Sequence, residues 1–449
     1  MIEKNVDEKF VVMTTGKISH IIPSLALPTV VSMLVSSIYN MADTFFVSRI
    51  STSASAAVGI VFSIMAIIQS LGFALGMGCG SNISRKLGEK NVVSANEFAS
   101  SAFFAALLLG VLLSVFSLTN LDALMVALGS SETVLPFAKS YGQYILLGAP
   151  IMMASFVMNN VLRWEGHASF SMIALTSGGV LNVVLDPIFI FGFKLGTAGA
   201  AIATLISQCV GFVIFAQFFL RKKGIVSISI FSISKKIRTY ILIVTTGLPS
   251  LFRQGLASVS TIFLNTHATV YGDAAVAGVS IVTRITMLVA SIMVGIGQGF
   301  SPVAGYNYGA QKFNRVKEAY SFTVKLGTAI LTSCGALLFF FAPTIIRFFR
   351  PDDAVIEIGS LTLRFQSAVL CLHGFVIGTN MLMQSTGKNL QATFLACNRQ
   401  GIYFIPLIFI LPHFFGIAGI AATQALSDIL SAITAIPYVI WFFRTARTR

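Results

Sequence analysis

The chain has 449 residues, of which 55% are hydrophobic and only 10% are charged, and its formal net charge is +14. Soluble domains carry roughly 25% charged residues, so this composition excludes an ordinary water-soluble fold. The basic residues lie at alternate ends of successive apolar segments, which is a membrane-topology signal and predicts a protein of the lipid bilayer that binds no nucleic acid.

Long segments free of Asp, Glu, Lys and Arg follow one another along the chain. A bilayer core of about 30 Å is crossed by about 20 apolar residues in a helix, so most of these segments hold one span each. Barrel strands would appear as roughly 10-residue alternating segments, and these segments do not alternate. We predict an all-α membrane protein with twelve transmembrane helices, at 18–46, 54–80, 95–117, 134–160, 167–191, 196–220, 238–265, 274–300, 318–342, 355–384, 391–412 and 416–443.

The connections between these spans carry an uneven distribution of basic residues. If the spans alternate in direction, most of the 30 Lys and Arg residues fall on one side of the membrane. By the positive-inside rule that side is the cytoplasm. We therefore expect a multi-pass protein of the cytoplasmic (inner) membrane, with both termini in the cytoplasm.

The chain also contains an internal repeat with an offset of about 221 residues. An even number of spans in each half gives both halves the same orientation, so the repeat is parallel, and halves related in this way are expected to bracket a substrate cavity. The predicted domains are an N-lobe at 1–220, a basic cytoplasmic linker at 221–237 and a C-lobe at 238–449, with six helices in each lobe. The repeat is defined by Leu27-Pro28 with Leu248-Pro249, by Gly76, Gly78 and Gly88 with Gly297, Gly299 and Gly309, by Gly166 with Gly387, and by Gly196, Gly199 and Ser207 with Gly416, Gly419 and Ser427.

No motif for a cofactor, a resident metal or a catalytic group stands out. The five cysteines are scattered singly and include no CxxC pair, so neither a zinc site nor a redox pair is supported. The Gly-x-Gly-x-Gly sequence at 295–299 follows no predicted strand and precedes no Walker lysine, so it does not indicate nucleotide binding. Intramembrane catalysis would need a paired nucleophile and base, which we do not find, and we expect no enzyme activity.

Two carboxylates fall at similar depths within the predicted spans. Asp43 lies about 25 residues into the first span and Asp186 about 19 residues into the fifth. Asn182 is one turn before Asp186 on the same helix face, and Thr204 reaches a comparable depth in the sixth span. Because an intramembrane carboxylate costs at least about 2.5 kcal/mol, these four residues are candidates for a proton relay or a weak Na⁺ site with oxygen ligands.

The repeat provides an internal comparison, because the equivalent positions of the second half carry no carboxylate. This asymmetry favours an ion site in the N-lobe only. The alternatives are that Asp43 lies near the lipid headgroups and that Asp186 caps a loop before Pro187. The offsets of 220 and 221 map Asp43 to Leu264, Asn182 to Ile402 or Tyr403, Asp186 to Pro406 or Leu407, and Thr204 to Gln424.

Other residues within the spans could distort a helix or line a cavity. Proline removes a backbone hydrogen bond, so Pro23 and Pro28 would let the first span bend when Asp43 changes charge, and a plain structural kink is the alternative. Arg284 and Gln298 of the eighth span are candidate substrate-cavity residues. Further charged residues within the spans, which would face a polar interior or reach an interface, include Asp428, Arg253, Arg364 and Arg399.

Three stretches carry a resemblance to a known family. Residues 42–47 (Ala-Asp-Thr-Phe-Phe-Val) resemble the signature of its first span, and residues 182–187 (Asn-Val-Val-Leu-Asp-Pro) that of its fifth span. Residues 295–309, from Gly-Ile-Gly-Gln-Gly to Gly-Tyr-Asn-Tyr-Gly, are similar to the signature of span 8 and its loop in the MepA-like bacterial branch. On these motifs the chain resembles the multidrug and toxic compound extrusion (MATE) family over essentially its whole length.

The resemblance implies a cation-coupled antiporter that uses a Na⁺ or H⁺ gradient to export amphipathic, often cationic, drugs and toxins by alternating access of the two lobes. It implies that the coupling ion binds at Asp43, Asn182, Asp186 and Thr204, which match the family's N-lobe cation site, and it implies no cofactor. Some branches carry a glutamate in span 7 that residues 247–254 lack, which puts a C-lobe cation site of that sort in doubt. The expected partners are small-molecule substrates and the bilayer, and the expected state is a monomer.

An alternative function is a flippase for a lipid-linked precursor, because related folds of the same superfamily perform it. Intramembrane arginines would then bind a pyrophosphate head group, and activity would depend on Arg284 more than on Asp43. The sequence leaves the choice between Na⁺ and H⁺ open, because carboxylates with oxygen neighbours serve either ion.

Overall fold

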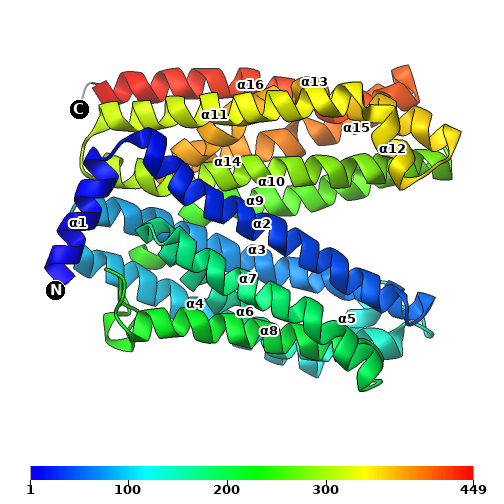
Figure 1. The fold of residues 1–449 in the computed structure, drawn as a ribbon, viewed down its shortest axis with the longest axis horizontal. Helices are drawn as coiled ribbons and strands as arrows, with labels where there is room; N and C mark the ends of the chain where they lie inside the picture. Colours follow the sequence, from blue (N-terminus) through cyan, green and yellow to red (C-terminus); the bar gives the residue numbers. More distant parts are fainter. Residues whose placement is uncertain (1, 448–449) are drawn as a thin grey trace. The chain divides into compact units, whose positions relative to one another are not determined.

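The computed structural model describes residues 2–447, and this part of the chain is built from helices without any β-strand (Figure 1). Eleven of the helices are long and apolar enough to cross a bilayer, which confirms an all-α membrane protein. In chain order the elements are α1 (Ile2–Thr15), α2 (Ile18–Ser48), α3 (Thr52–Gly88), α4 (Val92–Thr119), α5 (Leu121–Ala127), α6 (Leu135–Glu165), α7 (Ala168–Pro187), η1 (Ile188–Gly192), α8 (Gly196–Leu220), η2 (Ile230–Ser232), α9 (Ile237–Thr269), α10 (Asp273–Gly309), α11 (Phe313–Phe340), α12 (Ala342–Phe349), α13 (Asp353–Ser385), α14 (Asn389–Cys397), η3 (Asn398–Ile402), α15 (Phe404–Phe415) and α16 (Ile417–Arg447).

The seventh predicted span, 238–265, forms α9 but is not one of the eleven apolar helices. Its 33 residues are long enough for a bilayer, at about 1.5 Å of rise per residue. Arg253 and Gln254 interrupt its apolar run. This long helix therefore has a polar middle.

The internal repeat is visible in the backbone. The first residues of α3 and α10 are 221 positions apart in the sequence, and so are their last residues. The same offset relates α4 and α11. The equivalent turns also share a conformation, since Gly166 and Gly387 have φ angles of 96° and 76°, and Gly196 and Gly416 have φ angles of 58° and 57°. Glycine adopts positive φ without the steric cost of a Cβ atom, so these glycines define the same turns in both halves.

The chain forms two compact units. The first contains the residues before Val11 together with Val31–Gly247, and the second contains Val11–Val30 together with the chain from Leu248 onward. Helix α2 is divided between Val30 and Val31, and α9 is divided just after Gly247. Each unit therefore combines most of one repeat with the first part of the leading helix of the other repeat.

Two glycines at equivalent positions of the repeat allow this exchange of leading helices. In the first unit, a Cβ atom on Gly78 of α3 would lie 1.9 Å from the carbonyl oxygen of Ile243 in α9. In the second unit, a Cβ atom on Gly299 of α10 would lie 2.5 Å from the backbone nitrogen of Ala26 in α2. Small residues let helix backbones approach closely in lipid, so the repeated glycines determine where the leading helices pack.

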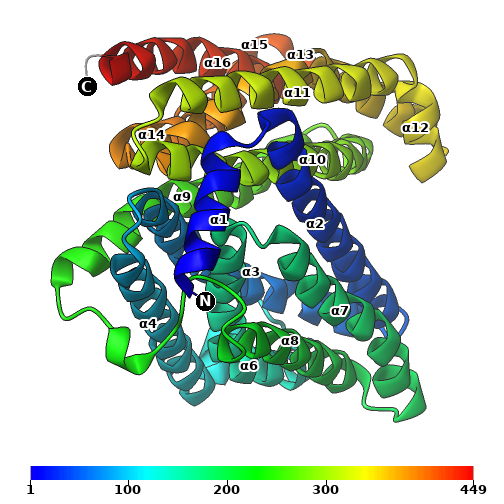
Figure 2. The ribbon, with the colours of Figure 1, turned by 60° about the vertical axis from the view of Figure 1, so that its left-hand side comes forward.

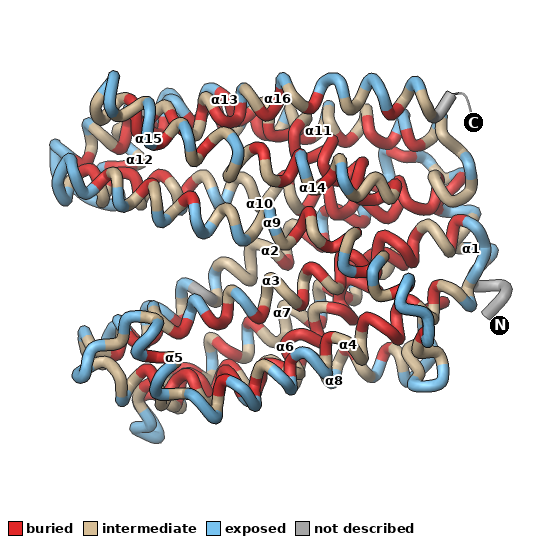
Figure 3. The backbone as a smooth tube through the Cα atoms, turned by 180° about the vertical axis from the view of Figure 1, so that it is seen from behind, coloured by how far each residue is buried: buried red, intermediate tan, exposed pale blue. Residues whose placement is uncertain are grey.

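One helix lies at the centre of each unit. In the first unit α6 contacts α3, α4 and α8, and 78% of its most apolar window is buried (Figure 3). In the second unit α13 contacts α10, α11 and α16. The central helices start and end near equivalent positions of the repeat, so both units are built around the same element.

The predicted linker, 221–237, lies in the first unit and runs from the end of α8 to the start of α9 (Figure 2). Side chains of α6 and α4 hold it in place. The buried Glu165 carboxylate at the end of α6 accepts hydrogen bonds from the backbone N–H groups of Ile225 and Val226. Three α4 side chains accept from linker amides: Asn96 from Ser227 at 2.8 Å, Ser100 from Ser229 at 3.0 Å and Ser101 from Ser234 at 2.8 Å. These acceptors order a segment that has little regular structure of its own.

Candidate functional site

A buried polar group joins α7 and α8 in the first unit. The Nδ2 atom of Asn182 lies 3.2 Å from Asp186 Oδ1, one turn later on α7, and 3.2 Å from Thr204 Oγ1 on α8. The exposed fractions of Asn182, Asp186 and Thr204 are 2%, 0% and 4%. A single amide therefore orients a carboxylate and a hydroxyl around itself by donating to both.

Asp43 of α2 lies beside this group and is held by a tyrosine. The hydroxyl of Tyr141, from the central helix α6, donates to Asp43 Oδ2 at 3.0 Å, and Tyr141 itself is fully buried. Asp43 and Asp186 are close enough to interact electrostatically with each other and with the Tyr141 hydroxyl. The structure thus brings together all four residues that the sequence analysis selected, and adds Tyr141 to them.

Several oxygens of this group have no hydrogen-bond donor. Oδ1 of Asp43, Oδ2 of Asp186 and Oδ1 of Asn182 are buried without a partner. A buried acceptor without a donor is costly, more so when it carries a charge, unless another species satisfies it. Partnerless carboxylate and amide oxygens fit a proton or a hard monovalent cation, which prefers oxygen ligands.

The position of Asp186 answers one of the alternatives raised by the sequence. Asp186 lies in the last turn of α7, which continues through Pro187 into the π-helical segment η1. Its side chain accepts from Asn182 within the helix and is fully buried. Asp186 therefore does not cap a loop before Pro187.

In the second unit, the positions equivalent to the two acids lie in or beside a hydrophobic cluster. Leu264, which corresponds to Asp43 in the repeat, is buried in a hydrophobic cluster. Phe404 and Ile408, which flank the positions equivalent to Asp186, belong to the same cluster. The asymmetry seen in the sequence is thus an asymmetry of packing, because one unit places acids where the other places a core.

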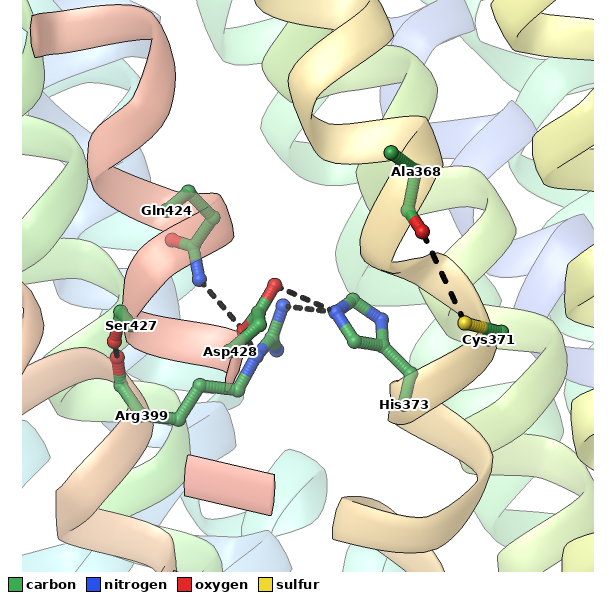
Figure 4. Close-up of polar contacts among 7 residues, drawn as sticks. All are labelled: Ala368, Cys371, His373, Arg399, Gln424, Ser427 and Asp428. Carbon is green, nitrogen blue, oxygen red and sulfur yellow. Dashed lines mark hydrogen bonds and ion pairs between the residues drawn. The ribbon is translucent and has the colours of Figure 1, made fainter. Parts of the chain in front are cut away.

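The second unit contains a different polar cluster, formed by α13, η3 and α16 (Figure 4). Asp428 Oδ2 lies 2.8 Å from His373 Nε2, and Asp428 Oδ1 accepts from Arg399 Nε at 2.6 Å. Gln424 Nε2 donates to Asp428 Oδ1 at 3.0 Å, one turn away on α16. Asp428 and His373 are buried, with 2% and 4% exposure, and Arg399 is 22% exposed. The sequence singled out Asp428 and Arg399 separately but gave no signal that joins them to His373.

Other residues selected from the sequence lie apart from these clusters. Arg284 is exposed, whereas Gln298 is 3% exposed and both its amide atoms lack a partner among the described residues. The two are 14 residues apart on α10, about 21 Å along a helix, so they do not form one contact site. Arg364 is also exposed and lies over the ring of Phe339.

Tyr141 is the functional candidate that sequence reasoning missed. It stands in an apolar segment near Tyr144, without an acidic neighbour or a motif to mark it. Its partner Asp43 is 98 residues away in the sequence, so only the packing of α6 against the other helices reveals the contact.

Together these features define a polytopic α-helical membrane protein with a parallel internal repeat and a buried carboxylate pair in one repeat only. The chain belongs to the MatE family, whose model matches residues 28–188 and 249–410, one segment in each repeat. It is 28% identical over 412 residues to the multidrug export protein MepA of Staphylococcus saprophyticus. The aligned region covers 92% of this chain and 91% of that protein.

Solved structures of MATE transporters resemble the whole chain. A MATE crystal structure in the straight conformation matches with a TM-score of 0.92 and 28% identity, covering 98% of this chain and 99% of that one. A MATE crystal structure in the bent conformation also matches with a TM-score of 0.92 and 28% identity, covering 99% of this chain and 98% of that one. The fold of two repeats is therefore shared along its full length.

Proposed function

We propose that this protein exports amphipathic, often cationic, drugs and toxins across the cytoplasmic membrane in exchange for Na⁺ or H⁺. The observation that carries the proposal is the carboxylate pair of Asp43 and Asp186, which lies buried among partnerless oxygens in a member of the MatE family. Homologues covering most of the chain are named multidrug export proteins, which supports an exporter over a flippase.

The coupling ion binds in the first unit in this proposal. Asp43 and Asp186 supply the negative charge, and Asn182 and Thr204 supply neutral oxygens. Tyr141 donates to the oxygen of Asp43 that the ion does not use, and so orients the carboxylate. Two carboxylates at electrostatic range repel each other until an ion or a proton neutralises them, which makes occupancy of the site a source of free energy for conformational change.

Helix α2 transmits this change. Its first part, with Pro23 and Pro28, belongs to the second unit, and its last part, with Asp43, belongs to the first. A movement between the units has to deform α2 next to Val31, and Pro28 lowers the cost because it removes a helix hydrogen bond just before this point. Related structures exist in straight and bent conformations, which supports a fold with two states.

The proposal includes an orientation in the membrane. The basic residues place both termini and the 221–237 segment in the cytoplasm by the positive-inside rule. The protein acts as a monomer, without a cofactor and without enzyme activity.

Ethidium uptake into everted membrane vesicles tests this function, because their lumen corresponds to the outside of the cell. We expect lumenal Na⁺ or lumenal acid, imposed separately, to drive uptake by the wild type, and Asp43→Asn to abolish it. Asp122→Asn is the matched control, because Asp122 is an exposed acid of the same unit that pairs with Lys139. Normal gradient-driven uptake by Asp43→Asn would refute the site.

A further inference from the structure

The polar cluster of the second unit carries an excess of positive charge. Arg399 is neutralised by Asp428, with Nε and Oδ1 2.6 Å apart. Helix α9, which carries Arg253, packs against η3, which carries Arg399: the Ser260 hydroxyl of α9 donates to the Gln400 carbonyl, and a Cβ atom on Gly401 would lie 3.0 Å from the Leu256 side chain. Arg253 has no carboxylate partner among the described residues. Its Nη1 atom donates only to the amide oxygen of Asn380, at 3.4 Å. The cluster and Arg253 together thus contain two guanidinium groups and one carboxylate.

An unneutralised guanidinium within a membrane span is costly and indicates a ligand or a functional role. Arg253 is neither exposed nor fully buried, and Arg399 is 22% exposed, whereas Asp428 and His373 behind them are buried. The two arginines are therefore the more accessible members of the group. Guanidinium groups bind planar oxygen anions with paired hydrogen bonds, so these arginines favour a carboxylate or a phosphate.

The backbone around Arg399 is built to present its side chain. Residues 398–402 form a π-helix, in which the Tyr403 N–H bonds to the Asn398 carbonyl at 3.0 Å and so leaves the Arg399 carbonyl without its α-helical donor. The hydroxyl of Ser427 from α16 donates to the Arg399 carbonyl, and that of Ser260 from α9 donates to the Gln400 carbonyl. Such π-bulges occur frequently at functional sites, and here two neighbouring helices supply hydroxyls that satisfy the freed carbonyls.

Partnerless polar atoms lie beside this segment. Both amide atoms of Asn398, which is fully buried, and Nδ1 of His373 have no hydrogen-bond partner. The Nε2 atom of His373 is 2.8 Å from Asp428 Oδ2 and 3.1 Å from Arg399 Nη2, and it cannot donate to the first while it accepts from the second. The cluster is thus incompletely satisfied within the chain, as a site that receives a polar ligand group would be.

We propose that Arg253 and Arg399 form a subsite that binds the anionic oxygen group, a carboxylate or a phosphate, of an amphipathic ligand. Asp428, His373 and Gln424 position the Arg399 guanidinium, and Asn380 positions that of Arg253. This inference rests on the proposed export function and assigns the recognition of a ligand's anionic group to these two arginines.

A matched pair of dyes tests the subsite. Tetramethylrhodamine in its free-acid form carries a carboxylate, and its methyl ester lacks only that charge. Binding of each dye to the purified full-length protein in phosphatidylcholine nanodiscs is measured by fluorescence anisotropy, for the wild type, Arg253→Gln, Arg253→Lys and Arg364→Gln. Arg364→Gln is the control, because Arg364 is another arginine within a span of the same unit, and it lies exposed outside the cluster.

The wild type should bind the acid more tightly than the ester. Loss of a charge-assisted hydrogen bond in Arg253→Gln should reduce the ratio of acid to ester affinity about tenfold or more, Arg253→Lys should reduce it less, and Arg364→Gln should leave it as in the wild type. If the wild type binds the ester as tightly as the acid, the proposal is wrong. The proposal is also wrong if Arg253→Gln leaves the ratio of acid to ester affinity unchanged.

Two further experiments distinguish a lipid phosphate from a substrate carboxylate as the ligand, and distinguish a failure of the subsite from a failure of the export function. Phosphatidylglycerol added to the nanodiscs should displace the acid dye from the wild type if a lipid phosphate occupies the subsite, and should leave it bound if the occupant is a substrate carboxylate. Vesicles that export the ester but show no preference for the acid would overturn the subsite alone. Vesicles that export neither dye, with no binding of either, would overturn both the subsite and the export function.

Discussion

Replacing Asp186 by Asn should make the ion-free protein more stable, although it removes a buried and hydrogen-bonded side chain. Asp186 is fully buried, its Oδ2 has no partner, and it interacts with the charge of Asp43. The asparagine oxygen can still accept from Asn182 Nδ2, which lies 3.2 Å from Oδ1 in the native protein. The substitution therefore removes a charge and retains the local hydrogen bond.

The magnitude follows from the cost of an ionised carboxylate in the membrane, which is at least about 2.5 kcal/mol. At a pH where both acids are ionised, Asp186→Asn should raise the free energy of unfolding by about 2 to 3 kcal/mol. Saturation with the coupling ion reduces this difference in stability, because it stabilises only the wild type. An ion at about 100 times its Kd stabilises the wild type by about 2.7 kcal/mol. The wild type and the variant should thus differ clearly without the ion and become nearly equal with it.

Thermal unfolding of the purified protein, followed by intrinsic fluorescence at alkaline pH in choline chloride and in NaCl, measures both effects. A proton-coupled protein would show the same convergence as the pH is lowered, without a response to Na⁺. Asp122→Asn serves as the control, because exposed ion pairs such as Asp122–Lys139 contribute at most about 1 kcal/mol. If Asp186→Asn is less stable than the wild type without the ion, or responds to the ion as the wild type does, the reasoning about the carboxylate pair is wrong.

Two other changes test the architecture of the site and of the units. Tyr141→Phe removes the 3.0 Å hydrogen bond to Asp43, and a hydrogen bond to a charged group is worth about 1.5 to 3 kcal/mol. The variant should therefore lower the apparent affinity for the coupling ion about tenfold or more in vesicle uptake assays. An unchanged dependence of uptake on ion concentration would exclude a role for the hydroxyl. Gly78→Ala should prevent accumulation of folded protein in the membrane, as judged by fluorescence-detected size exclusion, because its Cβ atom would overlap the Ile243 carbonyl. Gly59→Ala, with open space around the new Cβ atom, should accumulate normally.

The sequence by itself determined the class of protein and selected the four residues of the candidate ion site. Twelve helical segments were predicted from length and apolarity, and the helices observed agree with them except that Arg253 and Gln254 make α9 less apolar than its neighbours. Asp43 and Asp186 were recognisable because charge is rare in a span, and because the repeat supplied a comparison in which those positions carry no acid; Asn182 was recognisable because it lies one turn before Asp186. Periodicity, composition and repeat offsets are local properties, so they can be read without a fold.

Only the tertiary structure decided which distant residues meet. Tyr141 with Asp43, and His373 with Arg399 and Asp428, come from helices far apart in the sequence, and no local pattern encodes those contacts. The exchange of leading helices at Gly78 and Gly299 was equally hidden, since a glycine in a sequence does not say which backbone approaches it. These features depend on how apolar helix faces pack against one another, which is a property of the assembled helices and not of any single segment.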